Sequence, residues 1–536
     1  MKKEYSRSFW LRLCIILLLL PALLINLGLL TFIDDEAIRA LVALEMKLSG
    51  NYIAPTLHGE FYYNKPPLYN WILLLFFNLT GTISEFTARI PTVVCLLGYA
   101  TTIYYFFRQH FDTKIAFLNA LVFVTCGRVL FWDSMLGLID ICFSWVTFTG
   151  FMVVFQQFER QKYWTLFLLS YLIAAVGFLL KGLPAVVFQG ITLFTFFVYQ
   201  KQFRKLFSIQ HITGGFVFLF IVGLYYFLYH QYNSLDHVFE KLFTESSKRT
   251  AVNYGLGKTI LHFFTFPAEM VYHFLPWSLF VAYLFKKGAL QQIREHRFIA
   301  YNALIFLVNL LPYWTSVEVY PRYLLMHAPL VFSVFIYLHI KNEADNTLLF
   351  KILMNGLLVI CVIISISSFA PLFLKQTQQT PYLYPKTLAW GLGLSVATVL
   401  FFKWKAERLT VLVLFLVIFR IGFNWFVLPD RNANDFGDLC RTSTRTVGNV
   451  FATEKLYLYK ETMTFKEKDL PQITNSFYLT NERKQIIRRK SDSFQRDEFY
   501  IIDPARYKEL KYEQVGTFYL RHGKQTYHIG KLKLEE

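Results

Sequence analysis

Long apolar runs alternate with short polar segments through the first 428 residues of the chain. A run of about 20 apolar residues can cross the roughly 30 Å hydrocarbon core of a membrane as a helix. The pattern therefore predicts a polytopic α-helical membrane protein with about thirteen spans. These spans are expected at residues 10–32, 86–107, 115–138, 141–157, 163–180, 183–199, 209–229, 269–285, 298–316, 323–340, 348–370, 386–402 and 409–428.

One further apolar stretch, residues 66–81, decides the side on which every later loop lies. Counting it as a span would reverse the parity of all loops after it. Without it, nearly every short Lys/Arg-rich loop falls on the side of the N-terminus, as the positive-inside rule requires for the cytoplasm. We therefore predict an interfacial helix at 66–81 and a cytoplasmic N-terminus on an uncleaved first helix. The segments expected outside are 34–85, 230–268, 317–322, 371–385 and everything after 429.

The tail has a different pattern from the membrane part. From residue 429 it is polar and of mixed charge, with alternating or aromatic-rich stretches that are typical of strands: "KLYLY", "SFYLT", "EFYIID" and "GTFYLRHGKQTYHIG". The chain is thus expected to form a membrane domain over 1–428 and a small outward-facing α/β or α+β domain over 429–536.

Composition supports the membrane interpretation and excludes other classes. The 536 residues are 55% hydrophobic and only 17% charged, below the share of soluble domains. The net charge of +18 is spread over short loops, so it does not indicate nucleic-acid binding. Five of the six cysteines lie in apolar runs and none has metal-type spacing, which argues against redox chemistry.

Candidate chemistry gathers at the outer ends of the spans. Asp34, Asp35 and Glu36 open the first outer segment, where helix capping is the simple alternative to catalysis. Lys65 follows in "YYNKPP", beside Tyr62; a cation among aromatics at headgroup depth suits a lipid phosphate, and snorkelling to ordinary headgroups is the alternative. Two acids, Asp133 and Asp140, flank a turn at the same face, where ionisable groups are functional candidates.

The stretch "DDEAIRALVALEMKLSGNYIAPTLHGEFYYNKPPLYNW" resembles the first outer loop of integral-membrane glycosyltransferases that use polyprenyl-phosphate sugars. This group includes the bacterial aminoarabinose transferases of lipid A and the protein O-mannosyltransferases. Looser similarity continues through "IAFLNALVFVTC", "FLLKGLPAVVF", "FLPWSLF" and "PRYLLMHAPLVF". The resemblance implies a GT-C fold and transfer from an undecaprenyl-type phosphate donor.

The resemblance also implies roles for particular residues. Asp35 falls on the catalytic acid, with Glu36 its neighbour, and Lys65 falls on the lysine that contacts the donor phosphate. The second acid is Asp140, favoured by its distance from flanking motifs, or Asp133, favoured by its local sequence. Further donor-site candidates are Arg249, Lys181 and Tyr323, for which headgroup contacts or an aromatic belt are equal alternatives.

The implied reaction is a single inverting displacement at the outer face of a bacterial inner membrane by a monomeric enzyme. The acceptor is lipid A, another envelope glycan or a protein, and no nucleotide or nucleic acid takes part. Asn64 replaces a carboxylate that can join a metal site in aminoarabinose transferases, so a divalent metal is doubtful here. A lipid-linked glycan polymerase or ligase, or a flippase, is the alternative function. A flippase, however, would carry charges at mid-membrane on repeated halves.

Overall fold

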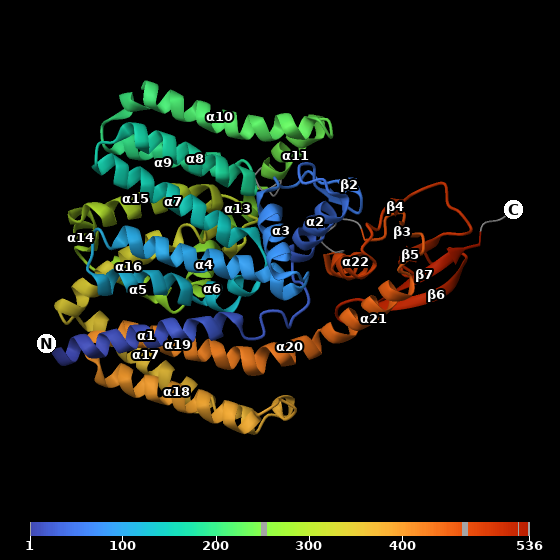
Figure 1. The fold of residues 1–536 in the computed structure, drawn as a ribbon. Coiled ribbons are helices and arrows are strands. Elements are labelled where there is room, and N and C mark those ends of the chain that lie inside the picture. Colours follow the sequence, from blue (N-terminus) through green and yellow to red (C-terminus); the bar gives the residue numbers. More distant parts are fainter. Residues whose placement is uncertain (1, 248–254, 464–469, 524, 534–536) are drawn as a thin grey trace.

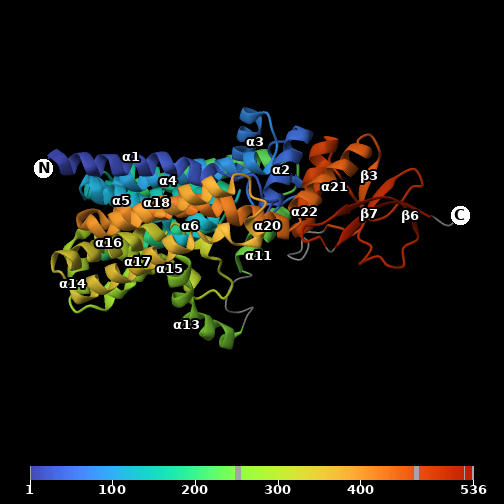
Figure 2. The ribbon, with the colours of Figure 1, turned by 90° about the horizontal axis from the view of Figure 1, so that it is seen from below.

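A computed structural model describes residues 2–247, 255–463, 470–523 and 525–533. Long helices lie side by side in a bundle, with the N-terminus at one end and a small sheet domain at the opposite end (Figures 1 and 2). Two shorter helices, α2 (Glu36–Ser49) and α3 (Leu68–Thr80), lie between the bundle and the sheet domain. The other helices of the bundle and its loops are α1 (Lys2–Leu24), α4 (Glu85–Phe107), α5 (Thr113–Thr125), α6 (Gly127–Phe131), α7 (Ile139–Glu159), α8 (Tyr163–Lys181), α9 (Pro184–Tyr199), α10 (Ile209–His230), α11 (Asp236–Ser247), α13 (Leu256–His273), α14 (Ala289–Glu295), α15 (Arg297–Trp314), α16 (Ala328–Ala344), α17 (Leu348–Ser367), α18 (Leu383–Lys403) and α19 (Arg408–Gly422).

The number of spans differs from the expectation. Eight helices in the described part of the chain are long and apolar enough to cross a membrane, and a bent pair at Thr113–Thr125 and Gly127–Met135 makes a ninth if it counts as one span. The expected count of about thirteen is therefore not confirmed. Residues 269–285 divide between α13 and the 3₁₀ helix η3 (Trp277–Phe285), and residues 323–340 divide between η4 (Pro321–Leu324) and α16. Prolines cause these breaks, because they lack the N–H that would continue a preceding helix.

The first outer segment forms helices, but α2 is not exposed on a membrane surface. All its residues from Glu36 to Met46 are buried, because helix α22 (Leu470–Arg483) of the sheet domain packs over it. Gly50 ends α2 in the left-handed conformation that favours glycine. Helix α3 runs crosswise to the long helices at the end of the bundle (Figure 1). It has 13 residues, too few to span a membrane.

Buried Glu45 holds the turn that follows α2. Its carboxylate accepts from the backbone N–H of His58 at 2.6 Å, from that of Gly59 at 3.1 Å and from the Thr56 hydroxyl at 2.7 Å. Burial raises the pKa of Glu45 to about 6. These bonds set the hairpin of β1 (Thr56–Leu57) and β2 (Glu60–Phe61), which leads the chain to Lys65.

The tail forms the expected small sheet domain. Its five strands have the order β4-β3-β5-β7-β6, with β3 parallel to β4 and β5, and β7 antiparallel to β5 and β6. Two helices, α21 (Gly437–Val450) and α22, connect it to the membrane part, and the expected boundary at 429 falls within α20 (Leu428–Asn434). The strands are β3 (Leu456–Tyr459), β4 (Arg489–Lys490), β5 (Phe499–Ile502), β6 (Tyr512–Tyr519) and β7 (Thr526–Leu532).

One expected strand was wrong. The stretch "SFYLT" lies inside α22, where Phe477, Tyr478 and Leu479 are all buried. Aromatic residues favour strands only weakly, and packing between α2 and α21 overrides that preference. The Tyr478 hydroxyl donates to Glu85 at 2.5 Å, and the Arg441 Nε–H donates to the same oxygen at 3.0 Å. These two hydrogen bonds connect the sheet domain to the start of α4.

Candidate functional site

Antiparallel helices bring opposite charges together at the end of the bundle that faces the sheet domain. Asp140 lies in the first turn of α7, and Lys181 lies in the last turn of α8, the next helix. Each charge complements the dipole of its own helix end. The Lys181 Nζ donates to Asp140 Oδ1 at 2.5 Å, and both side chains are about nine-tenths buried.

Arg322 in η4 joins this pair to the first outer segment. Its guanidinium Nε lies 3.6 Å from Asp140 Oδ2, and its Nη1 donates to Asp34 Oδ2. Asp34 has a φ of +58°, a left-handed conformation that Asp and Asn tolerate better than most residues. Residues from four separate parts of the sequence therefore form one network of ion pairs, Asp34–Arg322–Asp140–Lys181.

Aromatic rings line the cations of this network. The Lys181 Nζ lies 4.2 Å from the ring centroid of Tyr323, and the Arg322 guanidinium lies 4.6 Å from that of Tyr320. Such contacts stabilise a partly desolvated cation. Tyr323 is buried rather than displayed at the bundle surface, which favours a place in the site over an aromatic belt.

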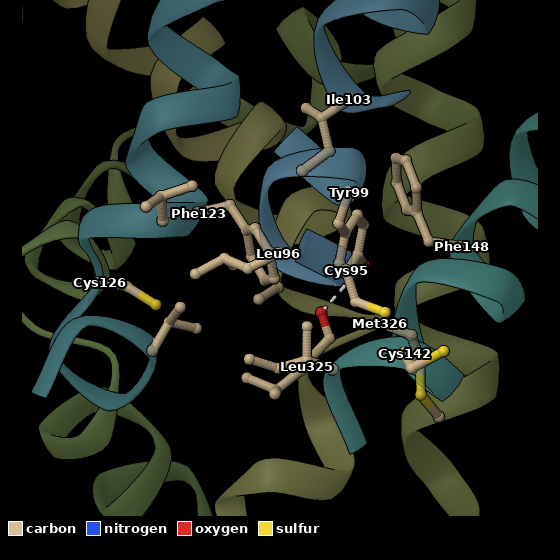
Figure 3. Close-up of a cluster of buried hydrophobic side chains, with 14 of the residues drawn as sticks. Cys95, Leu96, Tyr99, Ile103, Phe123, Cys126, Cys142, Phe148, Leu325 and Met326 are labelled. Atoms are coloured by element: carbon tan, nitrogen blue, oxygen red, sulfur yellow. Dashed lines mark hydrogen bonds between the residues drawn. The ribbon is translucent and has the colours of Figure 1, made fainter. Parts of the chain in front are cut away.

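The core beneath the site fixes η4. Leu325 and Met326 directly follow it and are fully buried among residues of α4, α5 and α7 (Figure 3). The Tyr99 hydroxyl donates to the backbone carbonyl of Leu325 at 3.2 Å. The Tyr99 ring packs against Phe123 and Phe148, with centroids 4.3 and 5.3 Å away. Close packing of this kind leaves Arg322 little freedom to move.

Asp35 is the acid that the local structure uses least. It occupies the N-cap position of α2, yet its side chain accepts no capping hydrogen bond. It is half-buried, and its charge acts on the buried guanidinium of Arg39. The capping interpretation therefore finds no hydrogen bond to support it, and the carboxylate of Asp35 is available for other chemistry.

Glu36 has a different environment from its neighbour. Its two oxygens accept two hydrogen bonds from the Arg89 guanidinium, each at 2.8 Å, and one each from the backbone N–H groups of Ile33 and Gly137. It is only 1% exposed. A Cβ at Gly137 would lie 2.7 Å from the carbonyl oxygen of Ala88, so only glycine allows this approach. The geometry suits a residue that orients the start of α2.

The remaining predicted residues lie at varying distances from the network. Lys65 is half-buried and near enough for its charge to act on Asp140. Tyr62 is buried, with the Arg39 guanidinium 5.5 Å from its ring centroid. Asp133 lies in a separate pair, where the Arg128 guanidinium donates to both of its oxygens at 3.0 Å. Arg249 lies outside the described residues.

Two residues of the site, Arg322 and Arg39, went unnoticed in the sequence, and Asp34 was named without a partner. Arg322 directly precedes the Tyr323 that was singled out, and a cation in an outer "PRYLL" turn was the available signal. Asp34, one of the three acids that open the first outer segment, pairs with Arg322, which no local pattern indicated. Arg39 lies one helical turn after Asp35, a spacing that places both on one face of α2.

Fold and site together define a multi-span membrane protein of GT-C architecture with one polar centre at the end of its bundle. The fold is that of ArnT: the crystal structure of ArnT from Cupriavidus metallidurans bound to undecaprenyl phosphate matches with a TM-score of 0.70 over 98% of both chains, at 16% identity. Residues 64–226 match the family model described as dolichyl-phosphate-mannose-protein mannosyltransferase, so this part of the chain is similar to that family.

Curated relatives match over shorter lengths. A protein of Aquifex aeolicus is 24% identical over 300 residues, covering 55% of this chain and 58% of its own length. The undecaprenyl phosphate-alpha-4-amino-4-deoxy-L-arabinose arabinosyl transferase of Shewanella sediminis is 27% identical over 176 residues, 31% of each chain. The chain therefore spans between about a third and three-fifths of these relatives.

Proposed function

We propose that the protein is a glycosyltransferase that moves one sugar from a polyprenyl phosphate of the undecaprenyl type to an acceptor outside the inner membrane. The observation that carries this is the cluster of Lys181, Arg322 and Lys65 around Asp140 at one end of a membrane bundle. Cations at headgroup depth suit a lipid phosphate. The fold shared with ArnT, which binds undecaprenyl phosphate, supports the same donor class.

The charges of the site suit the chemistry of the donor. A sugar bound to a lipid phosphate leaves behind a phosphate monoester, whose charge rises from about −1 toward −2 as the sugar–oxygen bond breaks. Fixed cations stabilise this increase most when they are already held in place. Lys181 and Arg322 are held by Asp140, so their positions do not depend on the donor.

Asp35 is the base in this proposal. An acceptor hydroxyl must lose its proton as its oxygen attacks the anomeric carbon, and a carboxylate that accepts no capping hydrogen bond from α2 can take it. Attack from the face opposite the phosphate inverts the anomeric centre. Asp140 orients Lys181 and Arg322, and Glu36 positions the start of α2 that carries Asp35. The acceptor is an envelope lipid such as lipid A, another envelope glycan or a protein.

Lys65 provides the direct test of the donor site. Replacing Lys65 with alanine should weaken binding of undecaprenyl phosphate by about tenfold or more, because a cation near the phosphate is lost. Arginine should restore only part of the affinity, since its planar fork differs from a compact ammonium. Native mass spectrometry of the purified protein with added undecaprenyl phosphate measures this. Lys47→Ala, in the same outer segment, is the matched control. Equal affinity in both Lys65 variants would mean that Lys65 contacts only ordinary headgroups.

The proposal also requires the site to face outward. The N-terminus lies at the opposite end of the bundle from the sheet domain (Figure 1), and basic loops lie on the side of the N-terminus. The native Cys440 of the sheet domain is fully buried, so a labelling test needs introduced cysteines. Ala505 and Lys287 are exposed, on the sheet domain and before α14 respectively. In a cysteine-free background, an impermeant maleimide should label Ala505→Cys in intact spheroplasts, and Lys287→Cys only after permeabilisation. The reverse pattern would contradict an outward site.

A further inference from the structure

Arg322 lies between two acids that approach from different parts of the fold. Asp34 belongs to the segment before α2, and Asp140 belongs to the start of α7; Arg322 contacts both. The guanidinium is 4% exposed, so water does not screen these contacts. A planar guanidinium is the side chain best suited to hold two carboxylates at once.

One donor of Arg322 has no hydrogen-bond partner in the described part of the chain. Its buried Nε–H lies 3.6 Å from Asp140 Oδ2, which is an ion-pair distance but too long for a hydrogen bond. Most buried donors in folded proteins have a partner, and an ordered water or a ligand can supply one that the protein lacks. The partner that fits an unfilled N–H beside Lys181 is an oxyanion.

The charge of the site leads to the same conclusion. Among the residues that the structure describes, three carboxylates (Asp34, Asp35 and Asp140) interact with four cations (Arg39, Lys65, Lys181 and Arg322), which leaves a formal excess of one positive charge in this set. A phosphate diester would neutralise this excess. A divalent cation would raise it to three, in a place where both Asp34 and Asp140 are already paired. Asn64 also stands where the aminoarabinose transferases that the sequence resembles have a carboxylate that can join a metal site.

We propose that Arg322 takes the place of a divalent metal in this chain: it holds Asp34 and Asp140 together and donates to the phosphate of the donor lipid. This rests on the proposed function and adds a residue to it. Metal ions in phosphate sites serve as fixed positive charge and as a bridge between acids. Arg322 supplies both functions from within the protein, so donor binding needs no added metal.

The first experiment needs only the wild-type protein. Purified full-length protein is dialysed against EDTA and titrated with undecaprenyl phosphate, with or without Mg²⁺ or Mn²⁺, and binding is followed by native mass spectrometry. Equal affinity in all conditions is expected. If affinity depends on the metal, the role of Arg322 is refuted while the donor class stands. If undecaprenyl phosphate does not bind in any condition, the proposed function itself fails.

The second experiment changes the residue. Arg322→Ala should bind undecaprenyl phosphate at least tenfold more weakly, and added guanidinium should restore part of the affinity. The same variant should gain a Mn²⁺ site visible by electron paramagnetic resonance, which Arg322→Ala combined with Asp140→Asn should lose. If the alanine variant does not fold, Arg322→Lys is measured instead, because lysine keeps the positive charge but cannot hold Asp34 and Asp140 together as the planar guanidinium does. Arg431→Ala, at the same end of the bundle, is the control. Wild-type affinity in both Arg322 variants would overturn the inference.

Discussion

Replacing Asp35 with asparagine should lower sugar transfer by about 10²-fold or more, the usual contribution of a general base. Asparagine keeps the shape of the side chain but cannot accept the proton of the acceptor. The fold should survive, because the Asp35 carboxylate caps no backbone N–H of α2. Binding of undecaprenyl phosphate should change little, since the cations of the site remain.

The measurement starts from a deletion strain. Mass spectrometry of its envelope lipids and glycoproteins identifies the missing sugar and its acceptor, and complementation with each variant then measures the product. Glu60→Gln, an exposed acid in the same outer segment, is the control and should restore the product fully. Product at the wild-type level in Asp35→Asn would rule out Asp35 as the base.

Replacing Asp140 with asparagine is expected to have the second large effect. It removes the carboxylate that pairs with both Lys181 and Arg322, and breaking a buried ion pair costs about 3–5 kcal/mol. Transfer should fall sharply, because both cations lose the group that positions them. Donor binding should also become weaker in Asp140→Asn, whereas it should change little in Asp35→Asn.

The matched variant is Asp133→Asn. Asp133 is equally buried and paired, with Arg128, so this variant should lose similar thermal stability. It should keep more transfer activity per folded molecule, because Asp133 lies in a pair separate from Lys181. Thermal unfolding in detergent and the envelope product, measured together, separate the two effects. Greater loss of transfer in Asp133→Asn would make Asp133 the second acid.

The pair Asp34 and Asp35 shows how far local sequence can assign roles. The acidic stretch could be recognised as a site, but the two neighbours could not be told apart. The ion pair of Asp34 with Arg322 predicts weaker donor binding in Asp34→Asn. That partner is 288 residues away, so no local pattern could have revealed it.

The apolar runs were enough to predict a helical membrane bundle. The thickness of the hydrocarbon core sets the length of a spanning helix, whichever residues that helix later contacts. The polar tail was recognised in the same way, and the stretches "KLYLY", "EFYIID" and "GTFYLRHGKQTYHIG" do contain strands. The local pattern failed where tertiary packing decides the structure. The stretch "SFYLT" forms a helix against α2, and two expected spans, 269–285 and 323–340, are broken at prolines.

The sequence alone determined that this is a membrane protein with acids and a lysine at one face of its bundle, since hydrophobic length and charge position are local properties. Only the tertiary structure decided which acid pairs with which cation. Asp34, Asp140, Lys181 and Arg322 meet because α7 and α8 are antiparallel and the buried residues after η4 fix its place. Charges buried together depend on the whole fold, because each one is tolerated only where a distant partner compensates it.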